Sequence, residues 1–562
     1  MLNSHVKSKK SLFVTMLAII MLLALTVACS KKEAAPASSV SPASSPASTP
    51  SQTQAAAESA TPAPLEPYEF TAYFNYDWYD ASAKWGDDKV SQFYNEKFNI
   101  KMKKAKPEGD PIQKLNVMIA SDDLPDVIQM ERDANYLKLI QLGKLIPLDE
   151  FINNNSSYKR IIDDKTIELS KVNGKVYGML NYATTTDHPT GNGGWAINKN
   201  IYEQLGSPKL QTTDDLLHYL KLVKDSNLKV DGKTVVPIQF AESGMIDLMM
   251  GSFGLNPLNA VEGVVPIQNE LKLYFNEPRA IDALLYLNKL WNNGLINKDY
   301  FVEKSEQIQE KLTTGRVAVY AGNNITSDLK DYRNTLKDHD PTNDYIVIEP
   351  PAAPGVDQSK VYNSTYSTLG WNVVGISNKA KNPERIFQLL DSIVSEDGSR
   401  LNVYGPEGGL YDELDSEGYP ILKSNLSSLS SEERKALGIG VWGILGNTKY
   451  ADFSKAANDN RKPVEERDWA TQAQINIIWK HSMNTDAYIG TTPEPQSPEG
   501  IAAASFSDLN LKALPKIVMA KDESQSRAAI AEALDNAYKL GFEKVEKFKT
   551  EIYQQNMKLL GQ

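Results

Sequence analysis

Strand-like and helix-like patterns of apolar residues alternate along the chain from about residue 67 onward. Residues 68–74 (YEFTAYF) are aromatic and β-branched, which is typical of a strand, and residues 88–98 place apolar side chains at helical spacing. This alternation predicts βαβ units, and therefore an α/β fold with mostly parallel sheets. The same pattern predicts further strands at 100–105, 126–130, 196–198, 316–320 and 345–348, and further helices at 110–119, 134–142, 276–294 and 382–393.

The helix predictions are strengthened by residues that favour helix starts. Asp110-Pro111 and Asn382-Pro383 each place a capping side chain before a proline at the first helical position. Beyond about residue 505 the apolar spacing is helical almost to the last residue, which predicts a helical C-terminal region.

A long apolar segment near the N-terminus differs from the rest of the chain. Residues 11–28 are almost all apolar and follow several lysines, and small residues lie near their end, as in a secretion signal. Cys29, the only cysteine among 562 residues, comes next. This arrangement resembles the bacterial lipoprotein signal, in which the cysteine is acylated and becomes the first mature residue. An uncleaved transmembrane helix is the alternative, but it leaves the position of the lone cysteine unexplained.

Residues 33–66 consist mainly of Pro, Ser and Ala. Almost nothing in this segment can be buried, so it is predicted to be a disordered linker that holds a folded body away from the membrane. The expected N-terminal organisation is therefore a signal peptide at 1–28 and a lipidated cysteine with its linker at 29–66.

Charge and composition exclude several classes of ligand. The chain carries 71 Asp and Glu against 60 Lys and Arg, a net charge of −11, which argues against nucleic acid. The five histidines share no metal-ligand spacing, and an acylated Cys29 leaves no thiol for a disulfide, a nucleophile or a zinc site. No metal and no cofactor are therefore expected.

Several short motifs follow one another between residues 67 and 560. The longest is LNVMIASDDLPDVI at 115–128. The others are GKLIPL at 143–148, GKVYG at 174–178, LWNNGLI at 290–296, TGRVAV at 314–319 and YGPEGG at 404–409. In this order, after a lipoprotein-like signal, they resemble the family 1 extracellular solute-binding proteins of ABC importers, especially the long lipoprotein subgroup associated with oligosaccharides.

The resemblance implies a two-lobed fold of the type II periplasmic-binding-protein class, with a ligand cleft between discontinuous α/β lobes. By analogy, the first lobe comprises 67–187 and 316–365, and the second comprises 190–315 and 366–562. The resemblance also implies a monomer anchored through Cys29 at the extracytoplasmic face of the cell membrane. Such a receptor captures an oligosaccharide and delivers it to the permease subunits of an ABC transporter.

Some members of the family hold calcium in a loop that corresponds here to residues 225–237. Lys229 and Lys233 interrupt this loop, and its oxygen ligands are too few, so no calcium is expected there.

A sugar ring offers flat patches of C–H groups and a rim of hydroxyl groups, so aromatic and acidic side chains are the expected contacts. Asp77 and Trp78 follow the first predicted strand, where cleft loops are expected. Asp123 lies between a helix and a strand, at a place that the family puts near the ligand. A solvated acidic turn is an equally good interpretation of Asp123.

The remaining candidates lie at expected crossings or in glycine-rich turns. Trp195 lies near the first crossing and Trp371 near the later one, whereas Tyr404, Glu407 and Trp442 belong to segments rich in glycine. A lone tryptophan is more often part of a core, so about half of these candidates are expected to contact ligand.

Three other functions compete with transport. A surface-anchored glycosidase or lyase requires paired carboxylates, but no pair stands out, and neither a Gly-x-Ser-x-Gly motif nor a phosphate-binding loop is present. A sensor that presents its ligand to a membrane kinase would use the same fold, and a peptide ligand is a further alternative. A binding protein without enzymatic activity is the prediction.

Overall fold

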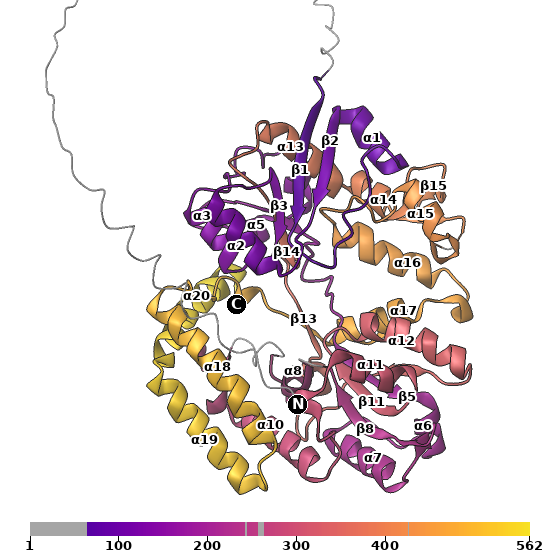
Figure 1. Ribbon diagram of the computed structural model, residues 1–562, viewed down its shortest axis with the longest axis vertical. Helices are drawn as coiled ribbons and strands as arrows, with labels where there is room; N and C mark the ends of the chain where they lie inside the picture. The colour runs from indigo at the N-terminus through magenta and orange to yellow at the C-terminus, as the bar shows by residue number, and fades with distance from the viewer. Residues whose placement is uncertain (1–64, 242–243, 257–262, 425) are drawn as a thin grey trace, which may run out of the picture. The chain divides into compact units, whose positions relative to one another are not determined.

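The computed structural model describes residues 65–241, 244–256, 263–424 and 426–562. The predicted signal segment and Cys29 lie outside the described residues, as does the linker up to residue 64. Two large β-sheets flanked by helices, together with four two-stranded sheets, form the described body (Figure 1). Within these ranges, every helix is too short or too polar to span a bilayer.

The first sheet contains five strands in the order β2–β1–β3–β14–β4. β1 is parallel to β2 and β3, whereas β14 is antiparallel to β3 and β4. Apolar side chains of these strands and their helices form one hydrophobic core. The strands are β1 (Tyr68–Phe74), β2 (Ile100–Ala105), β3 (Val127–Met130), β4 (Met179–Asn181) and β14 (Asn372–Ile376).

Helices pack around the first sheet, and several begin where the sequence predicts. Asp88 and Asp110 accept hydrogen bonds from first-turn N–H groups of α1 and α2, which satisfies otherwise unpaired donors. The helices of this part are α1 (Lys89–Phe98), α2 (Pro111–Ser121), α3 (Ala134–Gln141), α4 (Ser157–Ile161), α5 (Asp164–Leu169), α13 (Pro383–Val394), α14 (Glu396–Tyr404) and α15 (Ser431–Leu437). Helix α16 (Ser454–Asn460) packs against α17 (Trp469–Asn476), and its Ala456 shares a core with residues of the second sheet.

The second sheet contains four strands in the order β12–β5–β11–β8. β11 is parallel to β8, and β5 is antiparallel to both β11 and β12. The strands are β5 (Gly194–Asn198), β8 (Val236–Phe240), β11 (Val317–Gly322) and β12 (Tyr345–Ile348). The helices of this part are α6 (Lys199–Gln204), α7 (Thr213–Asp225), α8 (Gly244–Ser252), α10 (Pro278–Asn292), α11 (Ser305–Thr313), α12 (Ile325–His339) and α17 (Trp469–Asn476).

Helices α18 (Pro498–Val518), α19 (Glu523–Lys539) and α20 (Phe542–Leu560) confirm the predicted helical C-terminal region. They pack with α10 beside the second sheet (Figure 1). Phe506, Ile530 and Val545 share one core with strands β5, β8 and β11. The last helices therefore complete a core that begins more than three hundred residues earlier.

Strand pairing corrects two predictions. The sheets are mixed rather than mostly parallel, because β5 and β14 enter directly after the chain crosses from one sheet to the other. The prediction that 316–365 belongs to the first lobe is wrong, because β11 and β12 pair within the second sheet. Likewise, 366–562 does not lie wholly in the second lobe, because β14 and α13 belong to the first sheet and its core.

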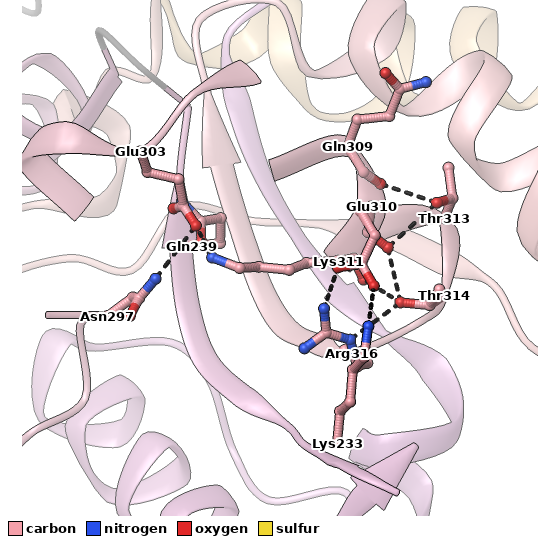
Figure 2. Close-up of polar contacts among 10 residues, drawn as sticks. All are labelled: Lys233, Gln239, Asn297, Glu303, Gln309, Glu310, Lys311, Thr313, Thr314 and Arg316. Carbon is pink, nitrogen blue, oxygen red and sulfur yellow. Dashed lines mark hydrogen bonds and ion pairs between the residues drawn. The ribbon is translucent and has the colours of Figure 1, made fainter. Parts of the chain in front are cut away.

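Polar contacts fix α11 to the second sheet (Figure 2). Lys311 forms an almost fully buried ion pair with Glu303 and donates to the Gln239 side chain on β8 at 3.2 Å. Asn297 donates to the same oxygen, Glu303 Oε1, at 3.2 Å, so this buried oxygen has two donors. Figure 2 also shows the more exposed carboxylate of Glu310 between Arg316 and Lys233.

Candidate functional site

A cavity of about 720 Å³ adjoins both sheets. Tyr182 follows β4 and Trp371 precedes β14 of the first sheet, whereas Asn323 follows β11 of the second. Hydroxyl and amide side chains make up most of the remaining lining. These are Thr190, Asn192, Asn324, Asn363, Ser364, Thr365, Tyr366, Ser367, Thr448, Gln474 and Thr485, together with Asp247, Asp452, Trp479 and two glycines.

Two crossing segments pass along this cavity. Residues 182–193 connect β4 to β5, and residues 349–371 connect β12 to β14. Within the second segment, β13 (Ser364–Tyr366) pairs in parallel with β17 (Ser482–Asn484), and Figure 1 shows β13 between the two sheets. The fully buried Asp486 accepts hydrogen bonds from Ser367 and Thr368, which holds this segment in place.

Glycine is required where the two crossings meet. A Cβ atom on Gly193 would lie 2.1 Å from the backbone oxygen of Asn363, so a side chain there would force the segments apart. Close approach of two chain segments is the observed reason at Gly193.

Asp247 is the more buried of two carboxylates in the lining. It lies on α8 and is only 5% exposed. Its Oδ2 accepts a hydrogen bond from Asn323 Nδ2 at 3.1 Å, whereas its Oδ1 has no hydrogen-bond partner among the described residues. Burial raises the pKa of this carboxyl to about 7, and the Asn323 hydrogen bond only partly offsets that effect.

Asp452 contributes the second carboxylate, from the segment 449–453 before α16. Lys455 lies 3.8 Å from its Oδ1. Burial raises the pKa of Asp452 despite this lysine. The cavity therefore holds two acids, both of which are protonated more easily than usual.

Asn363 carries further unused hydrogen-bonding capacity. Its side chain is 1% exposed, and neither its Oδ1 nor its Nδ2 has a partner among the described residues. Buried polar atoms are normally satisfied, and each exception calls for a physical reason. A ligand in the cavity that both donates and accepts hydrogen bonds would satisfy Asn363 and the free Asp247 oxygen.

Trp371 is the sequence-predicted candidate that lines this cavity. Its ring is 42% exposed and lies 5.2 Å, between centroids, from Tyr76. Trp78, 67% exposed, lies 6.4 Å from Trp371 but lines a neighbouring cavity of about 700 Å³. The two tryptophans therefore form an exposed aromatic surface, with Trp371 in the main cavity and Trp78 in the neighbouring one.

Three predicted contact residues are core residues instead, and those predictions are wrong. Trp195 is fully buried on β5 against Phe240, and Tyr404 is buried with its hydroxyl 2.6 Å from Ser454 Oγ. Trp442 is also fully buried and donates from Nε1 to Asp88 Oδ2 at 2.6 Å. Large aromatic surfaces favour burial when the fold supplies a core, and here it does.

The three acidic candidates are exposed and outside the cavity lining. Asp77 and Asp123 belong to loops beside the first sheet, and Glu407 belongs to the turn after α14. None of them lines the main cavity. Their proposed ligand contacts receive no support from this placement.

Sequence reasoning missed most of the polar lining. Asn323 and Asn324 directly follow a fully buried strand. A polar pair at the end of such a strand is a sequence signal from which their place in the cavity lining could have been predicted. Asp247 and Asp452 carried no such signal, because α8 and the segment around 452 are only brought to the cavity by the fold.

The loop expected to lack calcium forms a hairpin of β6 (Lys229–Val230) and β7 (Lys233–Thr234). Lys233 pairs with Glu310, 2.7 Å away. Among the described residues, no group of three or more His, Cys, Asp or Glu side chains is placed to hold a metal ion.

The sequence profile of the family described as bacterial extracellular solute-binding proteins matches residues 83–399, more than half of the chain. The chain belongs to this family. That assignment confirms the resemblance drawn from the ordered motifs, and members of the family are binding proteins.

Two curated relatives come from Bacillus subtilis. Lipoprotein LipO is 23% identical over 336 residues, which cover 58% of this chain and 64% of LipO. The polygalacturonan/rhamnogalacturonan-binding protein YtcQ is 24% identical over 319 residues, which cover 55% of this chain and 60% of YtcQ. The chain thus matches less than two thirds of the length of either relative.

A solved structure confirms the two-lobed fold. The ABC-transporter substrate-binding protein FusA of Streptococcus pneumoniae, in complex with kestose, has a TM-score of 0.60 to this chain at 17% identity. The superposition covers 87% of this chain and 99% of FusA. The fold is therefore that of type II periplasmic solute-binding proteins.

Proposed function

We propose that this family member is a membrane-anchored receptor that captures an oligosaccharide and delivers it to the permease subunits of an ABC transporter. The observation that carries the proposal is the polar cavity adjoining both sheets, in which the exposed Trp371 ring lies among hydroxyl, amide and carboxylate groups. A sugar ring stacks on an aromatic face and exchanges hydrogen bonds around its rim. The names of YtcQ and of the FusA complex, both of which concern carbohydrates, support this assignment.

Binding is coupled to closure of the lobes. A ligand in the cavity contacts residues that adjoin both sheets, such as Trp371 and Asn323. Only a closed arrangement makes both sets of contacts, so the ligand shifts the population toward that arrangement. The permease recognises the closed form, and the receptor releases the sugar chemically unchanged.

The N-terminal segment supplies the location. Acylated Cys29 holds the mature, monomeric protein at the extracytoplasmic face of the membrane, and the linker up to residue 66 sets its distance from the bilayer. LipO, a relative described as a lipoprotein, supports this part of the proposal.

Thermal unfolding of the full chain against a panel of oligosaccharides tests the function. A ligand at about one hundred times its dissociation constant adds roughly 2.7 kcal/mol to the free energy of unfolding, which is visible as a rise in Tm. The same mixtures are analysed for products by mass spectrometry. A rise in Tm with intact sugar is expected.

The other outcomes separate the alternatives. A rise in Tm with cleaved sugar would assign the chain to glycosidases or lyases. No rise with any sugar would contradict carbohydrate binding, and a peptide panel would follow.

A further inference from the structure

The charges in the main cavity are all of one sign. Asp247 and Asp452 line it, and no Lys, Arg or His belongs to its lining among the described residues. The remaining lining consists of aromatic, hydroxyl, amide and glycine residues. An anionic group that enters this space meets acids and finds no cation to pair with.

Two cations that contact residues of the lining are already engaged. Lys455 lies 3.8 Å from Asp452 and does not line the cavity. Arg132 donates to the backbone oxygens of Leu369 and of the lining residue Gly370 at 2.8 and 2.9 Å and does not itself line the cavity. Neither side chain is available to a ligand without losing its present partner.

The unpartnered buried atoms fit hydroxyl groups rather than carboxylates. Asp247 Oδ1 needs a donor, and Asn363 needs both a donor and an acceptor. A sugar hydroxyl both donates and accepts, whereas a carboxylate only accepts. A carboxylate beside Asp247 would leave that oxygen unpaired and add repulsion between like charges.

We propose that the cavity selects uncharged oligosaccharides and rejects those built from uronic acids. The inference rests on the proposed carbohydrate-binding function and narrows its substrate class. It separates this chain from YtcQ, whose name specifies polygalacturonan and rhamnogalacturonan. The reason for this selectivity is the cost of burying a ligand carboxylate in the cavity. Such a carboxylate loses its bound water, gains no cation and is repelled by the two acids, which weakens binding.

Matched ligand pairs that differ only in charge test the inference with the full chain at pH 8. One pair is tri-galacturonate and its fully methyl-esterified form, and another is xylotetraose with a glucuronic acid branch and the same compound with the carboxylate of that branch methyl-esterified. Affinities are measured by calorimetry. In each pair of which at least one member binds, the uncharged member is expected to bind at least tenfold more tightly than the acidic member.

Variants connect the selectivity to the cavity. The double variant Asp247→Asn with Asp452→Asn is expected to reduce severalfold the ratio of the affinity for the uncharged ligand to that for the acidic ligand. The control Asp123→Asn removes an exposed acid outside the lining and leaves this ratio unchanged. Lowering the pH from 8 to 5 narrows the ratio as well. Asp247, with its pKa near 7, gains a proton over this range, and Asp452 and Lys455 are the charged groups that also contribute around the cavity.

The outcomes distinguish the inference from the proposed function. An acidic member that binds as tightly as its uncharged partner, or more tightly, overturns the inference and leaves carbohydrate binding intact. Binding of neither member in any pair contradicts the proposed function itself, and the inference falls with it. A ratio that persists unchanged in the double variant also overturns the inference, because the cavity acids would then not be its cause.

Discussion

Trp371 shows what a single exposed ring contributes at this cavity. Replacing it by Ala is expected to weaken oligosaccharide binding by tenfold to a hundredfold, or about 1.4–2.8 kcal/mol, which is the usual loss for an aromatic anchor. The melting temperature should change little, because the ring is partly exposed already. Calorimetric titration measures the affinity.

The control for this change is Tyr404→Phe, which alters an aromatic side chain outside the cavity lining. It removes the hydroxyl that contacts Ser454 and should lower stability slightly while leaving affinity unchanged. Unaltered affinity in Trp371→Ala would remove this ring from the binding site.

Asp247 makes stability depend on pH. Its pKa in the folded chain is about 7, above the value of about 3.9 in an unfolded chain, so the folded state holds the proton more tightly between these values. Stability contributed by this group is therefore present at low pH and is lost as pH rises from about 4 to about 7. Asp247→Asn is expected to gain about 1–4 kcal/mol over the parent at pH 8, an advantage that shrinks toward pH 4.

Chemical denaturation at pH 4, 6 and 8 measures this difference. Glu407→Gln is the matched control, because it neutralises an exposed acid in a surface turn. An Asn variant with the same stability as the parent at every pH would contradict a raised pKa at Asp247. A higher free energy of unfolding for Asp247→Asn than for the parent at pH 8 would show that the Asp247 carboxylate lowers the stability of the folded protein.

Individual contact residues were the least predictable part of this chain. Trp195 lies on a strand buried on both faces, so no alternation of apolar and polar neighbours marks its side as interior. Trp442 satisfies its N–H with Asp88, a residue 354 positions away. Such long-range partners decide whether a tryptophan is buried, and they cannot be read from the sequence around it.

At the scale of elements, the anchoring of α11 depends on a buried ion pair. Lys311→Ala would leave the Glu303 carboxylate buried without its cation and should cost about 3–5 kcal/mol of stability. Lys233→Ala is the matched control, because its pair with Glu310 is exposed and contributes less than about 1 kcal/mol. Denaturant titration of both variants measures the difference, and equal losses would contradict the distinction between the pairs.

Elements themselves were well predicted where local signals fix them. β1, β2, α1 and α2 occur close to the predicted positions, because strand composition and the capping residues Asp88 and Asp110 act within a few residues. Strand direction was predicted wrongly, as mostly parallel, and strand order was not predicted. They depend on where the chain crosses between sheets, and Gly193 against Asn363 is a contact across 170 positions.

At the scale of the whole molecule, family resemblance supplied the two-lobed fold, but the division of the chain that was drawn from it by analogy was partly wrong. The segment 316–365 lies in the second lobe, because β11 and β12 find their hydrogen-bond partners in β5 and β8. The cavity acids come from both parts of this divided chain. Only the complete tertiary structure brings these two acids together, so no local sequence motif could predict them.

The position of α18–α20 constrains how the protein is made. Their apolar faces close the core of β5, β8 and α10, so synthesis must pass residue 545 before that core is complete. Until then, the nascent chain exposes a large apolar surface to aggregation and to chaperones. Folding of the second lobe must therefore wait for almost the entire chain, whereas most elements of the first lobe are available earlier.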